Sequence, residues 1–181
     1  MDHIDHVNLI RDGILLPKPE SPALTWADLG SGRGAFTLAL AEVLPFSAVI
    51  YSIDRDSAAL RDQERAMRVR FPRIVVHYLP ADFTHPLDLP LLDGVLMANS
   101  LHFHRHKEPL LSQIKSMLKP GGKLIVVEYA TDRGNTWVPH PLSFPTWEKL
   151  AARSGFADTR LLATRPSRFL GGVYSAVSDI P

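Results

Sequence analysis

Short apolar runs alternate with longer amphipathic stretches along most of the chain. Apolar runs typical of strands buried on both faces lie at about 24–29, 48–53, 74–79, 92–100 and 123–129. Apolar residues recur at helical spacing at about 34–44, 56–71, 107–118 and 144–153. Strands that alternate with helices in this order predict a parallel sheet that is covered by helices on both faces.

The two ends of the chain depart from this alternation. Residues 3–13 have apolar positions at helical spacing, and we expect a short helix that ends at Gly13, followed by a proline-containing connector. Two further strands are expected at 156–164 and 172–177. The segment between them is too short for a helical crossover, so these strands should pair as an antiparallel hairpin.

The whole pattern predicts an α/β fold: a Rossmann-like, doubly wound, mostly parallel seven-stranded sheet with helices on both faces and an antiparallel last strand. We expect a single domain over residues 1–181. Within it, residues 1–22 form the N-terminal helix and connector, and residues 23–178 form the Rossmann-like core.

Composition narrows the function classes without selecting one. A hydrophobic content of 45% and a charged content of 22% are ordinary for a globular protein. The net charge of +1 gives no bias toward nucleic acid or membrane, and we expect neither as a partner. The absence of Cys excludes disulfides and thiolate chemistry. The N-terminus lacks a signal-peptide pattern and no apolar window approaches a membrane span, so we expect a cytoplasmic protein.

Three alternating glycines, Gly30, Gly32 and Gly34, lie between the first predicted strand and the first long helix. A strand, a tight turn and a helix start expose backbone N–H groups to a bound cofactor. Gly30, Gly32 and Ala35 also fit the fingerprint of dinucleotide-binding folds. The motif alone therefore leaves a nicotinamide-dependent oxidoreductase open.

Two acids bear on the choice of cofactor. Asp54 ends the second strand and follows Gly30 at close to the spacing of about 20 residues at which an acid binds ribose hydroxyls. Asp28 lies two residues before Gly30, where a carboxylate would repel a pyrophosphate but suit a cationic ligand. S-adenosylmethionine carries a sulfonium and an ammonium, so electrostatics favours that cofactor. Asp28 bonded only to the turn, and Asp54 as a helix cap, remain alternatives.

At these residues the chain resembles the class I S-adenosylmethionine-dependent methyltransferases, over roughly residues 24–178. The segments that carry the resemblance are Asp28–Gly34, Ile53–Asp54, Ala81–Phe83, Ser100–His102 and Met117–Leu124. The last of these contains a Leu-Lys-Pro-Gly-Gly turn before the fifth strand, and its order after the glycine motif makes the resemblance specific.

The resemblance implies S-adenosylmethionine as methyl donor and S-adenosylhomocysteine as product. It places Asp28 near the amino group of the cofactor, Asp54 at the ribose and Asp82 at the adenine amino group. Asp82 as a turn cap and Phe83 as a core residue remain alternatives. The expected cofactor-binding residues are Asp28, Gly30, Ser31, Gly32, Gly34, Asp54, Arg55, Asp82, Phe83, Asn99 and Ser100.

Three histidines, His102, His104 and His106, alternate after the fourth strand, beside the expected methyl-transfer position. Carboxylates and cysteines are missing nearby, so we expect no metal site. A histidine has a pKa of about 6.5 and suits general-base chemistry, for which His102 ranks ahead of His104. Histidines that only shape the pocket remain an alternative, since an activated methyl donor can react through positioning alone.

The methyl acceptor is the part of the function that the sequence leaves open. Strand four ends in Ala98–Leu101, which lacks the Asn/Asp-Pro-Pro-aromatic signature of enzymes that methylate exposed amide or base nitrogens. Only the N-terminal segment and the loop Thr131–Leu142 are available to cover an acceptor, with Trp137 and Tyr129 as rings for stacking. We therefore expect a small-molecule acceptor, and a homodimer is one way to complete the cover. The alternative is an inactive, S-adenosylmethionine-binding module that acts through a protein partner.

Overall fold

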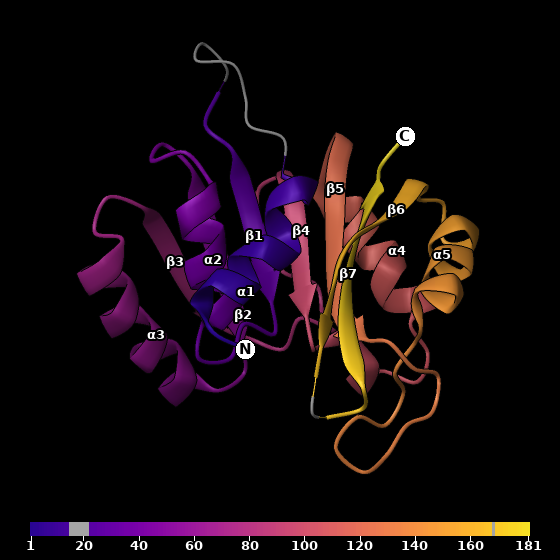
Figure 1. Ribbon diagram of the computed structural model, residues 1–181. Coiled ribbons are helices and arrows are strands. Elements are labelled where there is room, and N and C mark those ends of the chain that lie inside the picture. The colour runs from indigo at the N-terminus through magenta and orange to yellow at the C-terminus, as the bar shows by residue number, and fades with distance from the viewer. Residues whose placement is uncertain (15–21, 168) are drawn as a thin grey trace.

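A seven-stranded sheet forms the centre of the molecule in the computed structural model, which describes residues 1–14, 22–167 and 169–181 (Figure 1). The strands are β1 (Thr25–Leu29), β2 (Val49–Asp54), β3 (Val75–Pro80), β4 (Leu92–Ala98), β5 (Leu118–Tyr129), β6 (Ala157–Pro166) and β7 (Gly172–Asp179). Their order in the sheet is β3-β2-β1-β4-β5-β7-β6, and β7 runs antiparallel to both of its neighbours. The predicted Rossmann-like, doubly wound sheet is confirmed, including the hairpin of the last two strands.

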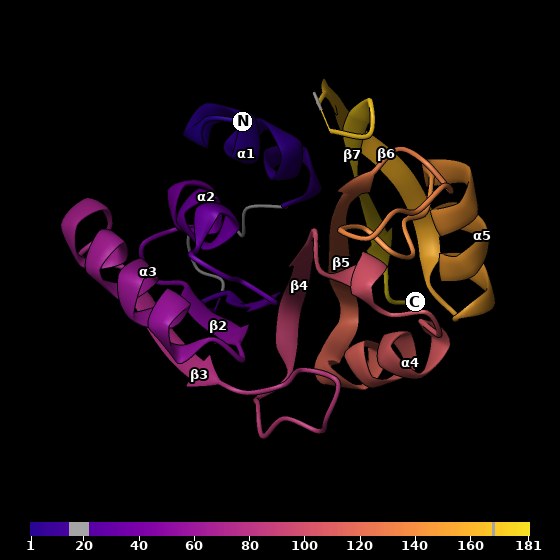
Figure 2. The ribbon, with the colours of Figure 1, turned by 90° about the horizontal axis from the view of Figure 1, so that it is seen from below.

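Helices cover both faces of this sheet (Figure 2). They are α1 (His3–Ile10), α2 (Ala35–Val43), α3 (Ser57–Arg70), α4 (Glu108–Met117) and α5 (Phe144–Arg153), with short 3₁₀ helices η1 (Arg11–Gly13) and η2 (Leu101–Phe103). The side chains of successive residues in β4 point to opposite faces of the sheet, as in any β-strand. Val95 and Met97 join the core under α4 and α5, whereas Leu96 joins the core under α1, α2 and α3.

The N-terminal helix is shorter than the predicted span of 3–13. Its α-helical part ends at Ile10, and a 3₁₀ turn continues to Gly13, whose missing side chain leaves room for Leu162 and Ile125. Asp2 caps the helix, and His3 Nε2 lies 2.6 Å from Glu42 Oε2 on α2. The predicted connector lies mostly in residues 15–21, outside the described residues.

Two element boundaries differ from the prediction. The expected turn at Lys119–Gly122 is part of β5, which begins directly after α4. At this turn the pairing of β5 with β4 shifts its register. Gly121 has a φ of 73°, and the carbonyl of Gly122 accepts the N–H of Ile180, so the end of the chain holds this segment in the sheet. The predicted fourth strand reaches residue 100, but β4 ends at Ala98 because Asn99 has a φ of +53°.

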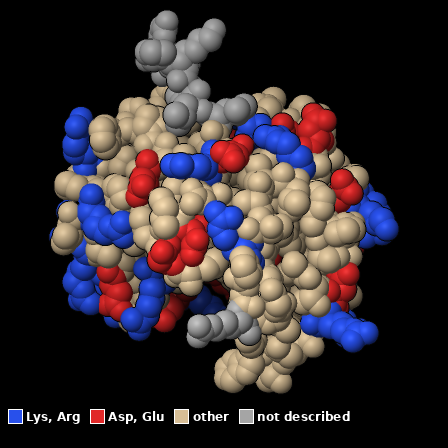
Figure 3. All heavy atoms as spheres, viewed as in Figure 1, with Lys and Arg blue, Asp and Glu red and all other residues tan. Residues whose placement is uncertain are grey.

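Charged side chains of both signs are interspersed over the face of the molecule in Figure 3. This distribution agrees with the small net charge of +1. In the part of the chain that the structure describes, every helix is too short or too polar to cross a membrane.

Candidate functional site

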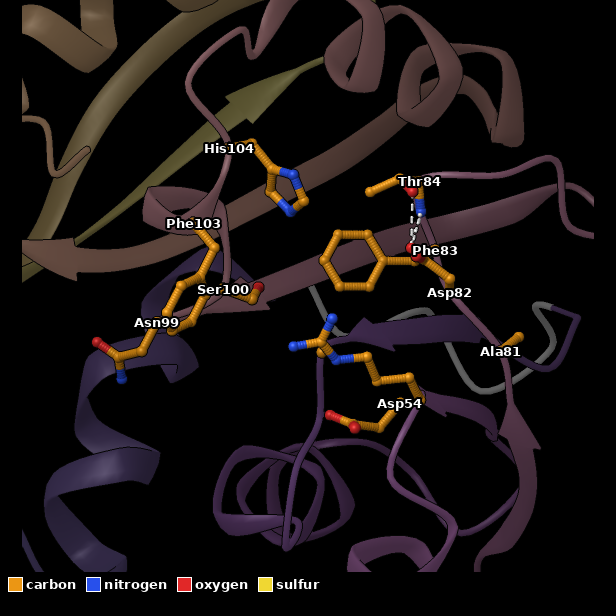
Figure 4. A pocket seen from close by; sticks show the side chains of 11 residues that line it. Asp54, Ala81, Asp82, Phe83, Thr84, Asn99, Ser100, Phe103 and His104 are labelled. Carbon is orange, nitrogen blue, oxygen red and sulfur yellow. Dashed lines mark hydrogen bonds between the residues drawn. The ribbon is translucent and has the colours of Figure 1, made fainter. Parts of the chain in front are cut away.

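Two adjacent cavities open where β1, β2 and β4 end and the strand order reverses. In such sheets, ligands bind beyond the carboxyl ends of the strands at this point. The larger cavity has a volume of about 290 Å³ and is lined by Gly30, Asp54, Arg55, Ala81, Asp82, Phe83, Thr84, Asn99, Ser100, Phe103 and His104 (Figure 4). The smaller, of about 270 Å³, is lined by His6, Asp28, Gly30, Ser31, Gly32, Arg33, Ala35, Phe36, Ala98 and Asn99.

The cavities share Gly30 and Asn99, so they lie side by side at the same edge of the sheet. Most of the residues expected at the cofactor and at the methyl-transfer position line one or both of them. Gly34, His102 and His106 are the exceptions. Gly34 precedes α2 and packs on the side chain of Gln63, and His102 lies behind the wall of the larger cavity.

The glycine loop requires glycine for two different reasons. Gly30, Gly32 and Gly34 all have φ between +53° and +84°, a left-handed conformation that other residues adopt at a cost. A Cβ on Gly30 would also lie 2.6 Å from the Cβ of Ser100. A Cβ on Gly32 would meet nothing within 4 Å, so this part of the loop faces open space where a ligand can approach the backbone.

A buried polar cluster supports the loop from behind. Ser52 Oγ lies 2.7 Å from Ser31 Oγ and 3.0 Å from Gln63 Oε1. The Ser31 hydroxyl is therefore occupied beneath the loop, although Ser31 lines the smaller cavity. Sequence reasoning missed Gln63, because a single polar residue on the buried side of a charged helix carries no distinctive signal.

Asp54 links the second strand to the glycine loop. Its Oδ2 accepts the N–H of Gly32 and its Oδ1 accepts the N–H of Asp56, both at 2.8 Å. The cap of α3 is Asp56, which accepts the N–H groups of Ala58 and Ala59, so Asp54 is not the helix cap. An ionised carboxylate has about four acceptor positions, so Asp54 keeps capacity for ligand hydroxyls in the larger cavity.

Asp28 is buried beneath the smaller cavity, with 1% of its surface exposed. Burial raises its pKa to about 7; the hydrogen bond that Thr37 Oγ1 donates at 2.6 Å opposes this shift, and the nearby charge of Asp54 adds to it. Near neutral pH the carboxyl group is thus only partly ionised. A cation placed beside it would lower that pKa and restore the full charge.

Asp82 and Phe83 each serve both the local structure and the cavity. Asp82 Oδ1 accepts the N–H and the hydroxyl of Thr84 at 2.9 and 2.7 Å, and these bonds lower the pKa of Asp82 (Figure 4). Asp82 therefore caps a turn, and it also lines the larger cavity. Phe83 packs against the core and meets the ring of His104 edge-on, with centroids 5.4 Å apart.

Asn99 and Ser100 close the floor between the two cavities. Ser100 Oγ donates to the carbonyl of Leu29 at 2.8 Å, which fixes the end of β4 to the end of β1. The side-chain oxygen of Asn99 is buried and has no hydrogen-bond partner among the described residues. Because a buried acceptor without a donor is costly, this oxygen fits a ligand that brings an N–H group.

His102 is buried and held by Glu128 of β5. His102 Nδ1 lies 2.8 Å from Glu128 Oε2, and Glu128 Oε1 accepts the backbone N–H groups of Leu101 and His102 at 3.0 and 3.1 Å. Glu128 has no exposed surface. Sequence reasoning missed Glu128, and the available signal was an acid at the end of the apolar run 124–127.

The three histidines are separated in the structure. His104 lines the larger cavity, and burial and the charge of Lys107 lower its pKa, so it is neutral at neutral pH. His106 is exposed. Within residues 1–14, 22–167 and 169–181, no group of three or more His, Asp or Glu side chains is arranged to hold a metal ion.

The loop Thr131–Leu142 is attached to the histidine segment by Lys107. Lys107 Nζ donates to the carbonyls of His104 and His140 at 2.8 and 2.9 Å, and the N–H of His140 donates to the carbonyl of His102 at 3.0 Å. Trp137 in this loop is 76% exposed, whereas Tyr129 packs between the rings of His102 and Phe169.

Comparison with known proteins agrees with this geometry. A family model described as a methyltransferase domain matches residues 27–126. Among curated relatives, the highly reducing polyketide synthase aurA of Calcarisporium arbuscula is 23% identical over 171 residues; the match covers 81% of this chain but only 7% of that protein. The ubiquinone/menaquinone biosynthesis C-methyltransferase UbiE of Wigglesworthia glossinidia brevipalpis is 28% identical over 104 residues, covering 57% of this chain and 42% of the relative.

Solved structures share the fold at low identity. The DszA carbon methyltransferase has a TM-score of 0.71 at 21% identity, covering 90% of this chain and 48% of that one. A protein from Bacillus halodurans, described as a putative methyltransferase, has a TM-score of 0.75 at 13% identity, covering 98% of this chain and 99% of that one. Since the family model matches more than half of the residues, and the sheet has the matching topology, the chain belongs to the class I S-adenosylmethionine-dependent methyltransferases.

Proposed function

We propose that this protein transfers a methyl group from S-adenosylmethionine to a carbon atom of a small-molecule acceptor, with His102 as general base. The observation that carries this proposal is the buried pair of His102 and Glu128 at the end of β4 and β5. A hydroxyl oxygen or an acidic carbon must lose a proton during methyl transfer, whereas a neutral amine can react through positioning alone. An oriented base therefore fits an acceptor that has a proton to lose.

The two cavities have the chemistry that the cofactor needs. Asp28 and the unpartnered oxygen of Asn99 would hold its ammonium group, Asp54 its ribose, and Asp82 and Phe83 its adenine. When bound, S-adenosylmethionine supplies an electrophilic methyl group on a positively charged sulfur. Acids on one side of the site and open backbone at Gly32 support this assignment, because they suit a ligand that is cationic and close to the chain.

Glu128 determines which nitrogen of His102 acts as the base. Its carboxylate accepts a hydrogen bond from Nδ1–H, which leaves the lone pair on Nε2. The proton of the acceptor carbon would pass to Nε2, and the electron pair of the broken C–H bond would form the bond to the methyl carbon, while the S–CH₃ bond of the bound donor breaks and its electron pair stays on sulfur. Glu128 stabilises the imidazolium that results, and a base placed in this way contributes about 10²–10⁴-fold in rate.

The names of several relatives support a carbon acceptor. DszA and UbiE are described as carbon methyltransferases, and polyketide synthases are among the curated relatives. We infer a carbon between two carbonyl groups as the acceptor class, since its proton is acidic enough for an imidazole. His102 is 2% exposed and lines neither cavity, so this step requires Phe103, which lines the larger cavity and packs on the His102 ring, to turn aside as the acceptor enters.

Radiolabelled S-adenosylmethionine and a β-keto thioester, the N-acetylcysteamine ester of acetoacetate, test this proposal. The wild type should label the thioester at carbon, and His102→Gln should lose about 10²–10⁴-fold in rate while its affinity for S-adenosylhomocysteine stays unchanged. His104→Gln is the matched control and should retain most of the rate. A His102→Gln variant as active as the wild type would contradict the assignment. Binding of S-adenosylhomocysteine without transfer to any carbon acceptor would favour the inactive, partner-dependent module instead.

A further inference from the structure

Helix α1 lies outside the residues that the family model matches, yet it forms one wall of the smaller cavity. His6 lines this cavity together with Asp28, Gly32 and Asn99. The helix is fixed on the core by Val7 and Ile10 and on α2 by the contact of His3 with Glu42. The position of His6 is therefore set by packing and does not depend on a ligand.

The lining of the smaller cavity combines hydrogen-bond acceptors with donors. Asp28 and the side-chain oxygen of Asn99 offer acceptors. His6 and Arg33 offer donors, although Arg33 is 83% exposed and lies 3.4 Å from Asp62. A cavity lined by both kinds of group fits a ligand end that carries both a positive and a negative charge.

We propose that His6 donates a hydrogen bond to the carboxylate at the amino-acid end of S-adenosylmethionine. This inference rests on the proposed function only in taking S-adenosylmethionine as the ligand. The edge of the His6 ring meets Phe36, with centroids 4.8 Å apart and planes at 63°, so Phe36 orients the imidazole at the cavity. Phe36 itself belongs to the first turn of α2, whose N–H groups have no side-chain cap and add partial positive charge on the same side.

His6 binds as a neutral donor. Burial is the largest of the effects that lower its pKa, and the N-terminal amino group and His3 lower it further, against the opposing charges of Asp5 and Asp2. A neutral imidazole still has one N–H group to donate. The N-terminal helix thus supplies the group that recognises the carboxylate, whereas the matched family segment supplies the groups for the ammonium and the nucleoside.

Calorimetric titration with two ligands separates this role from simple packing. The first ligand is S-adenosylhomocysteine, and the second is its decarboxylated analogue, which lacks only the carboxylate. His6→Phe keeps an aromatic ring against Phe36 and removes the donor, and it should weaken S-adenosylhomocysteine by about tenfold while leaving the analogue unchanged. His6→Gln restores a donor and should recover most of the affinity.

Ile4→Gln is the control, since Ile4 lies on the same helix, is 50% exposed and does not line the cavity. It should leave both affinities unchanged. Equal weakening of both ligands by His6→Phe, or no weakening of either, would overturn the inference while cofactor binding itself stands. A wild type that binds neither ligand would instead overturn the proposed function.

Discussion

The two halves of the site are built in different ways. The cofactor half, at the ends of β1, β2 and β3, uses backbone N–H groups and acids such as Asp54 and Asp82, whose partners are nearby in the chain or on a neighbouring strand end. The acceptor half, at the ends of β4 and β5, is joined by contacts between residues 26 and 33 positions apart, from His102 to Glu128 and from Lys107 to His140. The residues of the cofactor half can be recognised by motifs in the sequence, whereas the pairing in the acceptor half is visible only in the fold.

The halves also differ in charge. The cofactor half presents Asp28, Asp54 and Asp82, and the acceptor half presents imidazoles and Lys107 around one buried carboxylate. This division suits a cationic methyl donor in the cofactor half and an acceptor that loses a proton in the acceptor half. If it is functional, substitutions in one half should change one step and leave the other step unchanged.

The largest difference between the effect on the methyl-transfer rate and the effect on cofactor affinity is expected for Glu128→Gln. Its amide oxygen can still accept the backbone N–H groups of Leu101 and His102, but its NH₂ group requires an unprotonated Nδ1 on His102. The proton then moves to Nε2, and the base is lost. The rate of methyl transfer to the β-keto thioester should fall about 10²–10⁴-fold, with the Kd of S-adenosylhomocysteine unchanged. A fall in affinity of similar size would show that the two halves are not separate.

Asp28→Asn tests the charge of the cofactor half through stability. The pKa of Asp28 is raised from 3.8 to about 7, so its contribution to stability is complete below pH 4 and is lost as the pH rises through 7. At pH 8.5 the free energy of unfolding of the variant should therefore exceed that of the wild type by as much as about 4 kcal/mol, as measured by denaturant titration. At pH 4 the two should differ little. It should also bind S-adenosylhomocysteine more weakly, with a smaller loss for adenosine. Equal losses for both ligands would place Asp28 away from the ammonium.

Asp54→Ala should weaken cofactor binding by about 1–3 kcal/mol, because it would remove the proposed hydrogen bonds to the ribose and releases the N–H of Gly32. The rate at saturating S-adenosylmethionine should change little. Asp56→Ala is the control: it removes the cap of α3 and should lower stability, but it should leave the Kd unchanged. Equal Kd values for wild type and Asp54→Ala in calorimetry would remove Asp54 from the ribose site.

Lys107→Met gives the smallest expected effect, confined to the acceptor half. Two carbonyls lose their donor, so we expect a loss of about 1–2 kcal/mol in the free energy of unfolding and a several-fold higher KM for the β-keto thioester. Lys119→Met, at the opposite edge of the sheet, removes a partly exposed ion pair with Asp93 and should cost less than about 1 kcal/mol. A raised Kd for S-adenosylhomocysteine in Lys107→Met would contradict the separation.

The same comparison explains what the sequence predicts and what it does not. The glycine loop and the strand ends at Asp28 and Asp54 follow from periodicity and spacing, because each depends on its neighbours in the chain. The start of β5 was predicted wrongly, since the pairing of Gly122 with Ile180 is set by the far end of the chain. The glycines at 121 and 122 still interrupt the register against β4, but the strand continues through them and begins at Leu118.

Glu128 and Gln63 could not be recognised for a related reason. Each is a single polar residue on a buried face, and its meaning comes from a partner that the fold brings to it, His102 for Glu128 and Ser52 for Gln63. The positions of the histidines are likewise a result of the fold: His104 lines the cavity and His102 lies behind it. The roles of both histidines remain predictions.

The central claim is that the His102–Glu128 pair removes a proton from the acceptor carbon. The most direct test is the loss of deuterium from a β-keto thioester labelled between its two carbonyls, followed in water with S-adenosylhomocysteine bound and corrected for the uncatalysed rate. The wild type should accelerate this loss, and His102→Gln and Glu128→Gln should not. Equal acceleration by the wild type and both variants would contradict the account.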